Sequence, residues 1–463
     1  MKLIDRFVRS ILFSAKVYSP TSVLLSFSIC LLVCTTIPVA AGANTFTVNS
    51  GYDVADLTPG NGLCVAYLIV IPPFVLPFCT LRAAIQETNE LPGPDIIKLP
   101  SGTLRITLEG REDDLAQTGD FDITDDLEIR GKGQGKTFIN ADDLDRVLDI
   151  ITPGIKVTLS GVTLIHGNLP AGLPVDQQGG AGIRNRGDLI LSNCSLENNT
   201  LHGIETGDSG AGIANHGSCR LVYSTLNDNH SKNEAGAVLN ASQSSLTAYA
   251  STIYDNLAAT GGGITNYGTA SLTNMTISNN RATSPGISGG GIENYGTMTI
   301  RQSTIAENSA VDGGGIGNFD TLLMINTLLT ANSGDNCNGS SEITSQGGNL
   351  DDNSSCFMAA TDDDLFDVDP KIEQLRDNGG FTLTHRIYYS SPARDKGLPI
   401  ASITRDQRGR SHNGDGRYDI GAFEAAIPIT PILERLLLLD TWPLDDQNAA
   451  SRQYDKKSAR IAP

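Results

Sequence analysis

The sequence has few basic residues, and they form no cluster. Lys and Arg total 33 against 52 Asp and Glu, which gives a formal net charge of −19 and a pI near 4.6. Proteins that bind nucleic acid through its phosphates carry a basic patch or run. Its absence argues against a nucleic-acid partner, and the acidity by itself identifies no other.

Three other features are rare or absent in the sequence, and each limits the class of protein. Aromatic residues make up only 6% of a chain with 49 glycines, as is typical of a turn-rich β protein. No two cysteines have the C-x-x-C spacing of zinc and redox sites. No uninterrupted apolar run is long enough to span a membrane, because polar residues break 23–39 and the run 427–439 is too short.

The first 43 residues have the pattern of an export signal. Lys2, Arg6, Arg9 and Lys16 precede the apolar run 23–39, and Ala41-Gly42-Ala43 is an A-x-A cleavage site. We predict that the mature chain begins at Asn44 and is exported, to the extracellular space or the outer cell surface.

A short phrase, Gly-rich and ending in Ile-x-Asn, recurs through the middle of the chain. Its aliphatic positions, Ile183, Ile213, Val238, Ile264, Ile292 and Ile316, are separated by 30, 25, 26, 28 and 24 residues. A unit that returns at such a period is the signature of a solenoid. Between the phrases lie short alternating runs with Thr and Ile, which predict two or three strands per unit, and Gly and Asn, which predict turns.

These units predict an all-β fold: a right-handed parallel β-helix, a single-stranded solenoid, with a short N-terminal capping helix. Coils about 4.8 Å apart would place equivalent residues on top of one another. The aliphatic positions would then form an internal ladder. A parallel structural ladder of side-chain amides is predicted from Asn185, Asn215, Asn240, Asn266, Asn294 and Asn318.

Six cysteines follow the signal, and an exported protein can form disulfides. Cys64 with Cys79 and Cys337 with Cys356 are the natural pairs, because each closes a short loop. Cys194 and Cys219 fall at non-equivalent repeat positions, and the sequence leaves open whether they are bonded.

One segment predicts a helix. Residues 80–89 have helical character, Thr80 is a suitable N-cap, and Pro92-Gly-Pro94 ends the run. A helix before the first coils would cover the open end of a solenoid core.

Two sets of motifs carry a resemblance to known families. Cys79-Thr-Leu-Arg-Ala-Ala-Ile85 with Pro-Gly-x-Asp95 resembles the N-terminal domain named for its Cys-Ser-Leu-Arg-Glu-Ala motif, although Thr80 and Ala83 depart from it. Six motifs between Leu375 and Glu424 are similar to the choice-of-anchor C-terminal region. Both resemblances imply an exported bacterial β-helix of the pectin-lyase-like superfamily. They imply no reaction, since that fold serves many functions.

The pattern divides the chain into five parts. We predict a signal peptide at 1–43, an N-terminal cap and first coils at 44–140, and β-helix repeats at 141–335. C-terminal coils and a closing motif follow at 336–425, where His385 and Arg408 are expected to close the end coil, and then a partly disordered tail at 426–463. Membrane association through the tail stays open but is not predicted.

No catalytic residue can be assigned. The candidates are Arg184, Glu293 and Asp312, of which Arg184 and Glu293 share the x position of Ile-x-Asn. No cofactor is predicted, although Asp362, Asp364, Asp367 and Asp369 leave calcium open, since hard cations bind converging oxygens.

Two functions remain. The first is an exported or cell-surface β-helix with a structural, adhesive or carbohydrate-binding role, whose partner is a polysaccharide or another surface component. The alternative is a polysaccharide lyase or glycoside hydrolase that acts on the external face of the helix.

Overall fold

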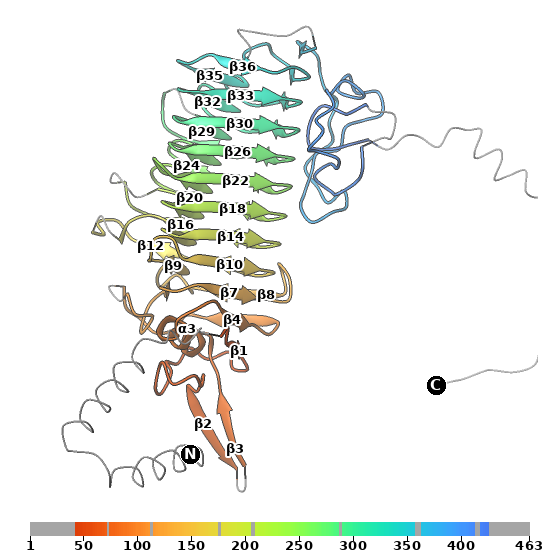
Figure 1. The fold of residues 1–463 in the computed structure, drawn as a ribbon. Helices are drawn as coiled ribbons and strands as arrows, with labels where there is room; N and C mark the ends of the chain where they lie inside the picture. Colours follow the sequence, from red (N-terminus) through yellow and green to blue (C-terminus); the bar gives the residue numbers. More distant parts are fainter. Residues whose placement is uncertain are drawn as a thin grey trace, which may run out of the picture.

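The computed structural model describes residues 42–71, 74–111, 114–174, 177–204, 209–286, 289–356, 363–412 and 417–425. Over these residues the chain is nearly all β and forms a long right-handed parallel β-helix, drawn as a rod in Figure 1. The predicted fold class is confirmed. The signal-like segment up to Ala41 and the tail 426–463 lie outside the described residues.

Two sheets of 11 strands run the length of the rod. The first sheet contains β1 (Thr45–Thr47), β4 (Asp95–Lys98), β7 (Leu127–Arg130), β10 (Lys156–Ser160), β14 (Asp188–Ser192), β18 (Ser218–Val222), β22 (Ser245–Tyr249), β26 (Thr269–Thr273), β30 (Thr297–Arg301), β33 (Leu322–Ile325) and β36 (Ile343–Ser345). The second sheet contains β5 (Gly102–Arg105), β8 (Thr137–Asn140), β11 (Thr163–Ile165), β15 (Ser195–Glu197), β19 (Thr225–Asn227), β23 (Thr252–Tyr254), β27 (Thr276–Ser278), β31 (Thr304–Ala306), β34 (Leu328–Thr330), β37 (Leu350–Asp351) and β38 (Leu365–Phe366).

A third sheet of 9 strands carries the Ile-x-Asn phrases, and a fourth sheet of 5 very short strands adds a side that the sequence did not predict. The third sheet contains β6 (Phe121–Ile123), β9 (Leu148–Ile150), β13 (Ile183–Asn185), β17 (Ile213–Asn215), β21 (Val238–Asn240), β25 (Ile264–Asn266), β29 (Ile292–Asn294), β32 (Ile316–Asn318) and β35 (Cys337–Gly339). The fourth contains β12 (Asn168–Leu169), β16 (Thr200–Leu201), β20 (His230–Ser231), β24 (Leu257–Ala258) and β28 (Arg281–Ala282).

Equivalent residues stack in register through the third sheet. Ile183 pairs with Ile213, and the pairing continues through Val238, Ile264, Ile292 and Ile316, all fully buried in one continuous core. Burial of this aliphatic row is the main favourable term that holds neighbouring coils together.

Buried asparagines form two ladders beside this core. From Asn185 to Asn318, each Nδ2 donates to the next Oδ1 at 2.7 to 2.9 Å. A second ladder from Asn199 to Asn332 repeats the pattern at 2.8 to 3.0 Å. Each amide therefore satisfies its neighbour in a place that water does not reach, which makes these residues part of the scaffold.

The N-terminal end is closed by α3 (Leu81–Glu90). Thr80 is its N-cap, with its hydroxyl accepting a hydrogen bond from the Ala83 N–H at 3.1 Å. Leu81, Ala84 and Ile85 join the hydrophobic core, so the helix covers the first coil as predicted. An antiparallel hairpin of β2 (Tyr67–Ile71) and β3 (Phe74–Phe78) projects from this end (Figure 1).

Arg82 ties the helix to the first coils. Its guanidinium is fully buried and pairs with Asp53, with Nε–Oδ1 at 2.6 Å. It also donates to the backbone carbonyls of Ala116 and Gly119, and it lies over the Phe121 ring. A buried cation with all these partners is stable where an unpaired one would not be.

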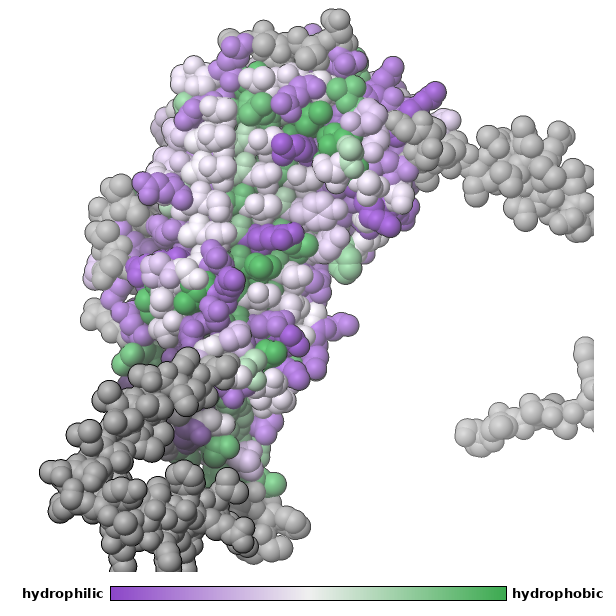
Figure 2. Space-filling model, viewed as in Figure 1, coloured by the Kyte–Doolittle hydropathy of each residue, from purple (hydrophilic) through white to green (hydrophobic). Residues whose placement is uncertain are grey.

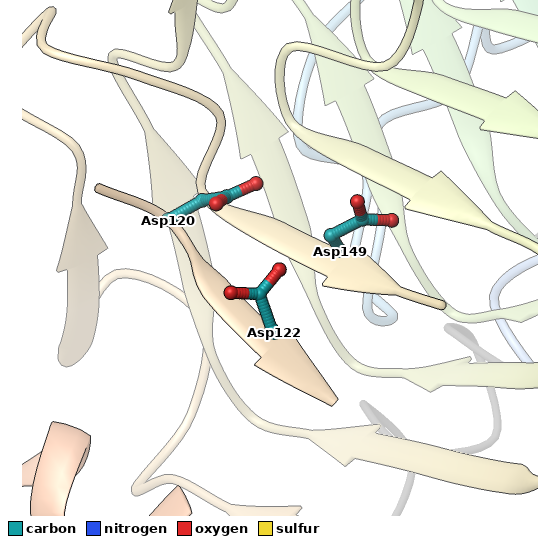
Figure 3. Close-up of side chains that lie close together, drawn as sticks. All are labelled: Asp120, Asp122 and Asp149. Atoms are coloured by element: carbon teal, nitrogen blue, oxygen red, sulfur yellow. The ribbon is translucent and has the colours of Figure 1, made fainter. Parts of the chain in front are cut away.

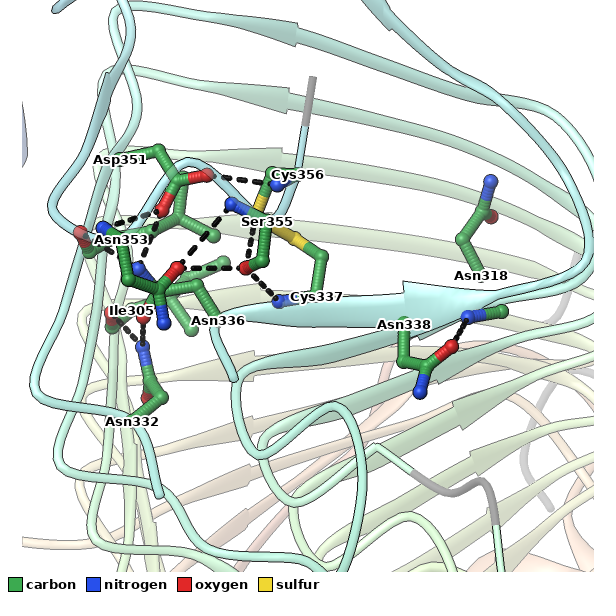
Figure 4. Close-up of a disulfide and its surroundings, with 12 residues drawn as sticks. Ile305, Asn318, Asn332, Asn336, Cys337, Asn338, Asp351, Asn353, Ser355 and Cys356 are labelled. Carbon is green, nitrogen blue, oxygen red and sulfur yellow. Dashed lines mark hydrogen bonds between the residues drawn. A yellow bond between two sulfur atoms is a disulfide. The ribbon is translucent and has the colours of Figure 1, made fainter. Parts of the chain in front are cut away.

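Both expected disulfides are present. Cys64 bonds Cys79 in the cap, and Cys337 bonds Cys356 in the last coils, where Asn336 and Asp351 surround the bond (Figure 4). Cys194 and Cys219, left open by the sequence, are free and buried. Burial raises the pKa of the Cys194 thiol to about 11, which keeps it protonated and unreactive.

The segment 369–425 does not close the end coil, and that expectation for His385 and Arg408 is wrong. The segment turns back and lies beside the coils, drawn in blue in Figure 1. His385 is within 2.9 Å of the Ser278 hydroxyl on β27, in the middle of the rod. Arg408 pairs with Asp406 inside the segment itself.

Side chains of the second sheet and of the turns that lead into it hold this segment in place. The Thr252 hydroxyl donates to the Leu383 carbonyl at 2.7 Å, and Gln302 Nε2 donates to the Gly421 carbonyl at 2.9 Å. These bonds join residues more than 100 positions apart in the sequence, so no local pattern could reveal them.

The side of the rod seen in Figure 2 is covered mainly by hydrophilic and near-neutral residues, with a narrow hydrophobic stripe along the long axis. Among the described residues, no helix has the length and apolar character needed to cross a membrane.

Candidate functional site

The middle residue of each third-sheet strand points away from the aliphatic core, because side chains alternate along a strand. In register, this outer row consists of Asp122, Asp149, Arg184, Ala214, Leu239, Thr265, Glu293, Gly317 and Asn338. All but Asn338 are buried, although they face outward. The charged residues are the first three of the row and Glu293, and uncharged residues lie between them.

At the N-terminal end of the row, carboxylates and guanidinium groups neutralise one another. Arg184 forms a bidentate ion pair with Asp149. Its Nε lies 3.0 Å from Oδ1, and its Nη2 makes a second, shorter contact with Oδ2. Arg146 pairs with Asp120 at 2.9 Å and approaches Asp149 at 3.4 Å. Figure 3 shows Asp120, Asp122 and Asp149 close together, the first two at β6 and the third on the neighbouring strand β9.

This acidic group is the one set of described residues whose carboxylate oxygens come close enough together, within 4.8 Å, to suggest a metal. Its partners argue against that use. Arg146 and Arg184 already supply positive charge, and Asp122 accepts the Ala116 N–H at 2.8 Å. Burial raises the pKa of Asp120 to about 7, with Arg146 opposing the shift and Asp145 adding to it. The donor set fits an internal ion-pair network better than a calcium site.

Further along the row, Glu293 has no lysine or arginine partner among the described residues. Its Oε1 accepts the Tyr295 hydroxyl at 3.1 Å, and its Oε2 is buried without a partner among the described residues. Burial raises the pKa of Glu293 to about 7. Hydrogen bonds from the Thr260 and Tyr295 hydroxyls oppose the shift, and the nearby Glu234 carboxylate adds to it. The adjacent Thr265 hydroxyl is likewise buried without a partner.

Gly261 lies directly over this pair. Its φ is +60°, and a Cβ at this position would come within 1.9 Å of the Thr265 hydroxyl and 3.4 Å of Glu293 Cβ. Only glycine fits this turn without displacement. The turn shields Glu293 from solvent, so the carboxyl is 1% exposed.

A row of rings runs just outside Glu293. The residue that follows each ladder asparagine occupies one position in every coil, and from His216 onward its N–H bonds the asparagine carbonyl one coil earlier. This turn row consists of Arg186, His216, Ala241, Tyr267, Tyr295 and Phe319. Tyr267 stacks on Tyr295 with ring centroids 5.0 Å apart, and Tyr295 stacks on Phe319 at 4.7 Å.

The small side chain of Ala241 interrupts the row below Tyr267. One ring face of Tyr267 is covered by Tyr295, and the other borders a hollow of about 520 Å³. The hollow is lined by Ile204, Ser209, Asn233, Glu234, Leu239, Ala241, Ser242 and Tyr267. No lysine or arginine is among these described lining residues.

Glu234 fixes the polar side of the hollow. Both of its carboxylate oxygens accept the Tyr267 hydroxyl at 3.1 Å. Burial raises the pKa of Tyr267, and the Glu234 charge raises it further, so the phenol keeps its proton and donates it. Glu234 is placed by a stacked turn in which it pairs with Ser209 and Thr260 of the neighbouring coils.

The three catalytic candidates do not share a site. Arg184 is bound to Asp149, whereas Glu293 lies four strands further along the sheet, about 19 Å away at the usual strand spacing. Asp312 is exposed in the loop before β32. Neither Arg184 nor Asp312 lines the hollow.

The acidic residues after the repeats do not converge where they are described. Asp364 is buried and accepts from the Ser345 hydroxyl at 2.6 Å and from the Asn349 N–H at 2.9 Å, which closes a coil. Asp369 accepts the Lys371 N–H, and Asp367 is exposed in a turn. Asp362 lies outside the described residues.

Sequence reasoning did not single out Tyr267, Glu234 or the hollow. The signal was present at the position after each Ile-x-Asn phrase, where aromatic residues follow Ala241. These aromatic residues point to a site only once it is known that their positions stack in neighbouring coils.

No family model matches the chain, and no curated protein matches it. Among solved structures, the crystal structure of pectate lyase Pel9A is similar, with a TM-score of 0.43 and 16% sequence identity. The alignment covers 83% of this chain and 98% of that one. The likeness concerns the fold alone.

Proposed function

We propose that this protein is an exported or cell-surface β-helix that binds carbohydrate on its side, in the hollow beside Tyr267. The observation that carries the proposal is the free ring face of Tyr267 above Ala241, with the Glu234 carboxylate at the edge of that ring. The C–H face of a sugar ring packs on an aromatic face, while its hydroxyls donate to carboxylate and amide oxygens.

The dimensions support this use. The hollow has the volume of an ordinary small-ligand site, and its lining combines apolar side chains with a few polar groups. Export is supported by the predicted signal and by two disulfides, which persist in oxidising compartments. The resemblance to exported bacterial β-helices, through the Cys-Thr-Leu-Arg-Ala-Ala and C-terminal motifs, is in line with a surface role.

Affinity electrophoresis tests the proposal with soluble neutral β-glucan in the gel. We expect the wild-type protein to be retarded, and Tyr267→Ala to lose at least about tenfold in affinity because the packing face is gone. Ala241→Phe should also abolish retardation, since the added ring fills the gap. Tyr388→Ala, which removes an exposed tyrosine elsewhere, serves as the matched control. Binding that is unchanged in Tyr267→Ala and Ala241→Phe would contradict this site.

One observation favours the alternative of a polysaccharide lyase or hydrolase. Glu293, with a pKa raised to about 7 and Glu234 nearby, has the protonation behaviour of a general acid. It is shielded from the hollow, however, so it does not reach a bound sugar without movement of the Gly261 turn.

The two functions are separated by assaying reducing ends and unsaturated products on neutral and uronate polysaccharides, with and without calcium. The binding function predicts no turnover. Turnover that is lost in Glu293→Gln while binding persists would establish the enzyme instead.

A further inference from the structure

The hairpin of β2 and β3 is apolar on both faces. Its register pairs Tyr67 with Phe78 and Ile69 with Leu76 on one face, and Leu68 with Pro77 on the other. Leu68 is 50% exposed and Leu76 is 44% exposed. No charged residue occurs anywhere in the sequence from Val65 to Phe78. Residues of both faces, Leu68 on one and Ile69 and Leu76 on the other, are exposed, so neither face is covered by the described body of the rod.

Exposed apolar residues continue around the base of the hairpin. Tyr52 is 73% exposed, and its ring lies 6.2 Å from that of Tyr67. Leu57, whose N–H bonds the Val65 carbonyl, and Leu63, next to the disulfide, are also exposed. We call this set the apolar cap surface: Tyr52, Leu57, Leu63, Leu68, Ile69 and Leu76.

Exposed hydrophobic residues are concentrated at this end of the chain. Seven of the 15 large hydrophobic residues that are exposed in the described part of the chain lie between Tyr52 and Leu76. Scattered exposed hydrophobic residues need no explanation, whereas a gathered set marks an interaction surface.

The base of the hairpin is firmly held. Tyr67 stacks on Phe78 at 4.8 Å, the Ser50 hydroxyl lies 2.9 Å from the Tyr67 hydroxyl, and Cys64–Cys79 closes the segment. A two-stranded hairpin is marginal in water on its own. Here the cap presents it as a projection from the end of the rod (Figure 1).

The charges nearby indicate an electrically neutral occupant. Between Asn44 and Glu90 the sequence has four acidic residues, Asp53, Asp56, Glu87 and Glu90, and one basic residue, Arg82. Arg82 is buried against Asp53 and presents no charge to a ligand. Anionic lipid is attracted by exposed Lys and Arg, and this segment offers none.

We propose that the apolar cap surface inserts into the interfacial region of a zwitterionic lipid bilayer. Lipid surrounds a projection and covers both faces, whereas a protein that packs on a hairpin covers one. Pro77 lacks an N–H and weakens strand pairing along β3, which disfavours a second copy at that edge. Because the hairpin edges carry unpaired backbone groups, insertion stops in the interface and does not reach the hydrocarbon centre.

Vesicle flotation tests this proposal with the purified exported protein, its N-terminus determined by mass spectrometry. The probe is a phosphatidylcholine vesicle. We expect the wild-type protein to float with the vesicles, equally at low and high salt, with no gain when anionic lipid is added. Ile69→Asp/Leu76→Asp, on one hairpin face, should reduce the bound fraction at least about tenfold, since each charge must be desolvated.

Val311→Asp provides the matched control, because Val311 is an exposed aliphatic residue of a distant coil. Circular dichroism would verify that all variants are folded. The proposal is overturned if the wild-type protein does not float, or if the hairpin variant floats as well as wild type, as it would if the tail made the contact. It is also overturned if the hairpin variant only dissociates a dimer, seen by light scattering, without vesicle binding.

Discussion

Two positions in the outer row of the third sheet, Asp149 and Glu293, bury carboxylates in opposite ways. Asp149 shares the same row with Glu293, and both are almost completely removed from water. Asp149 is clamped by Arg184 and approached by Arg146. Glu293 interacts only with hydroxyl groups, those of Tyr295 and Thr260, and its Oε2 has no partner within hydrogen-bond distance among the described residues.

The difference separates scaffold from candidate function. A buried charge with good partners is held in one state and gives the coils their register. A buried carboxyl without a cation takes up a proton instead, and such groups gather at functional sites. Glu293 lies beside the hollow of Tyr267 and Glu234, whereas Asp149 is enclosed by Arg184 and Arg146.

The largest expected effect on stability comes from removing the buried ion pair between Arg184 and Asp149. Arg184→Met leaves Asp149 buried with only the longer Arg146 contact, and we expect a loss of about 3–5 kcal/mol in the free energy of unfolding. Chemical denaturation followed by circular dichroism measures it. In Arg184→Met/Asp149→Leu both charges are gone, so most of the loss should be recovered. A single variant as stable as wild type would show that the clamp is not structural.

A smaller change in stability, of opposite sign, is expected when Glu293 is replaced. Burial raises the pKa of Glu293 from 4.5 to about 7, so the folded state holds this proton more tightly than the unfolded state. Its contribution to stability is therefore full below about pH 4.5 and is lost as the pH rises through about 7. Glu293→Gln cannot ionise, and it should be more stable than wild type at pH 8, on the order of 1–3 kcal/mol.

Thermal unfolding of both proteins between pH 4 and pH 8 measures this difference. The melting temperatures of wild type and Glu293→Gln should be equal near pH 4 and should differ increasingly toward pH 8. Asp120 and Asp419, whose pKa values burial also raises to about 7, titrate in both proteins and cancel from the comparison. A gap that does not depend on pH would contradict the assignment.

The smallest effect concerns the hydroxyl next to Glu293. Thr265→Val replaces a buried hydroxyl without a partner by a methyl group of the same shape, and a gain of up to about 1 kcal/mol is expected. Thr276→Val is the contrasting variant, because the Thr276 hydroxyl donates to Gln407 at 2.6 Å. It should be destabilised in the same melting assay. Equal shifts in the two variants would show that the Thr265 hydroxyl has a partner after all.

The repeats made the scaffold predictable from sequence. Ile213 and Asn215 recur at a fixed place in each phrase, and strand spacing alone then stacks them. The capping helix and both disulfides could also be predicted, since their signals are local. The clamp could not, because Asp149 lies in Leu148-Asp149-Ile150, a coil that lacks the glycine phrase and so hides its equivalence to Arg184.

The remaining features depend on contacts that leave no periodic trace. The segment 369–425 docks on the second sheet through hydrogen bonds from Thr252 and Ser278 and through an apolar cluster with Leu328 and Leu350. The hollow exists because Ala241 has a small side chain, whereas the adjacent residues of the turn row, His216 and Tyr267, have large ones. Its carboxylate comes from Glu234, which lies in a different turn. Each becomes visible only once the register of the coils is known.

The most direct test of the proposed site is a crystal structure of the protein with a neutral β-glucan oligosaccharide. We expect one sugar ring to pack on the face of Tyr267 that Tyr295 leaves free, above Ala241, with a hydroxyl bonded to Glu234. A sugar bound elsewhere on the rod, with this hollow filled only by solvent, would contradict the account.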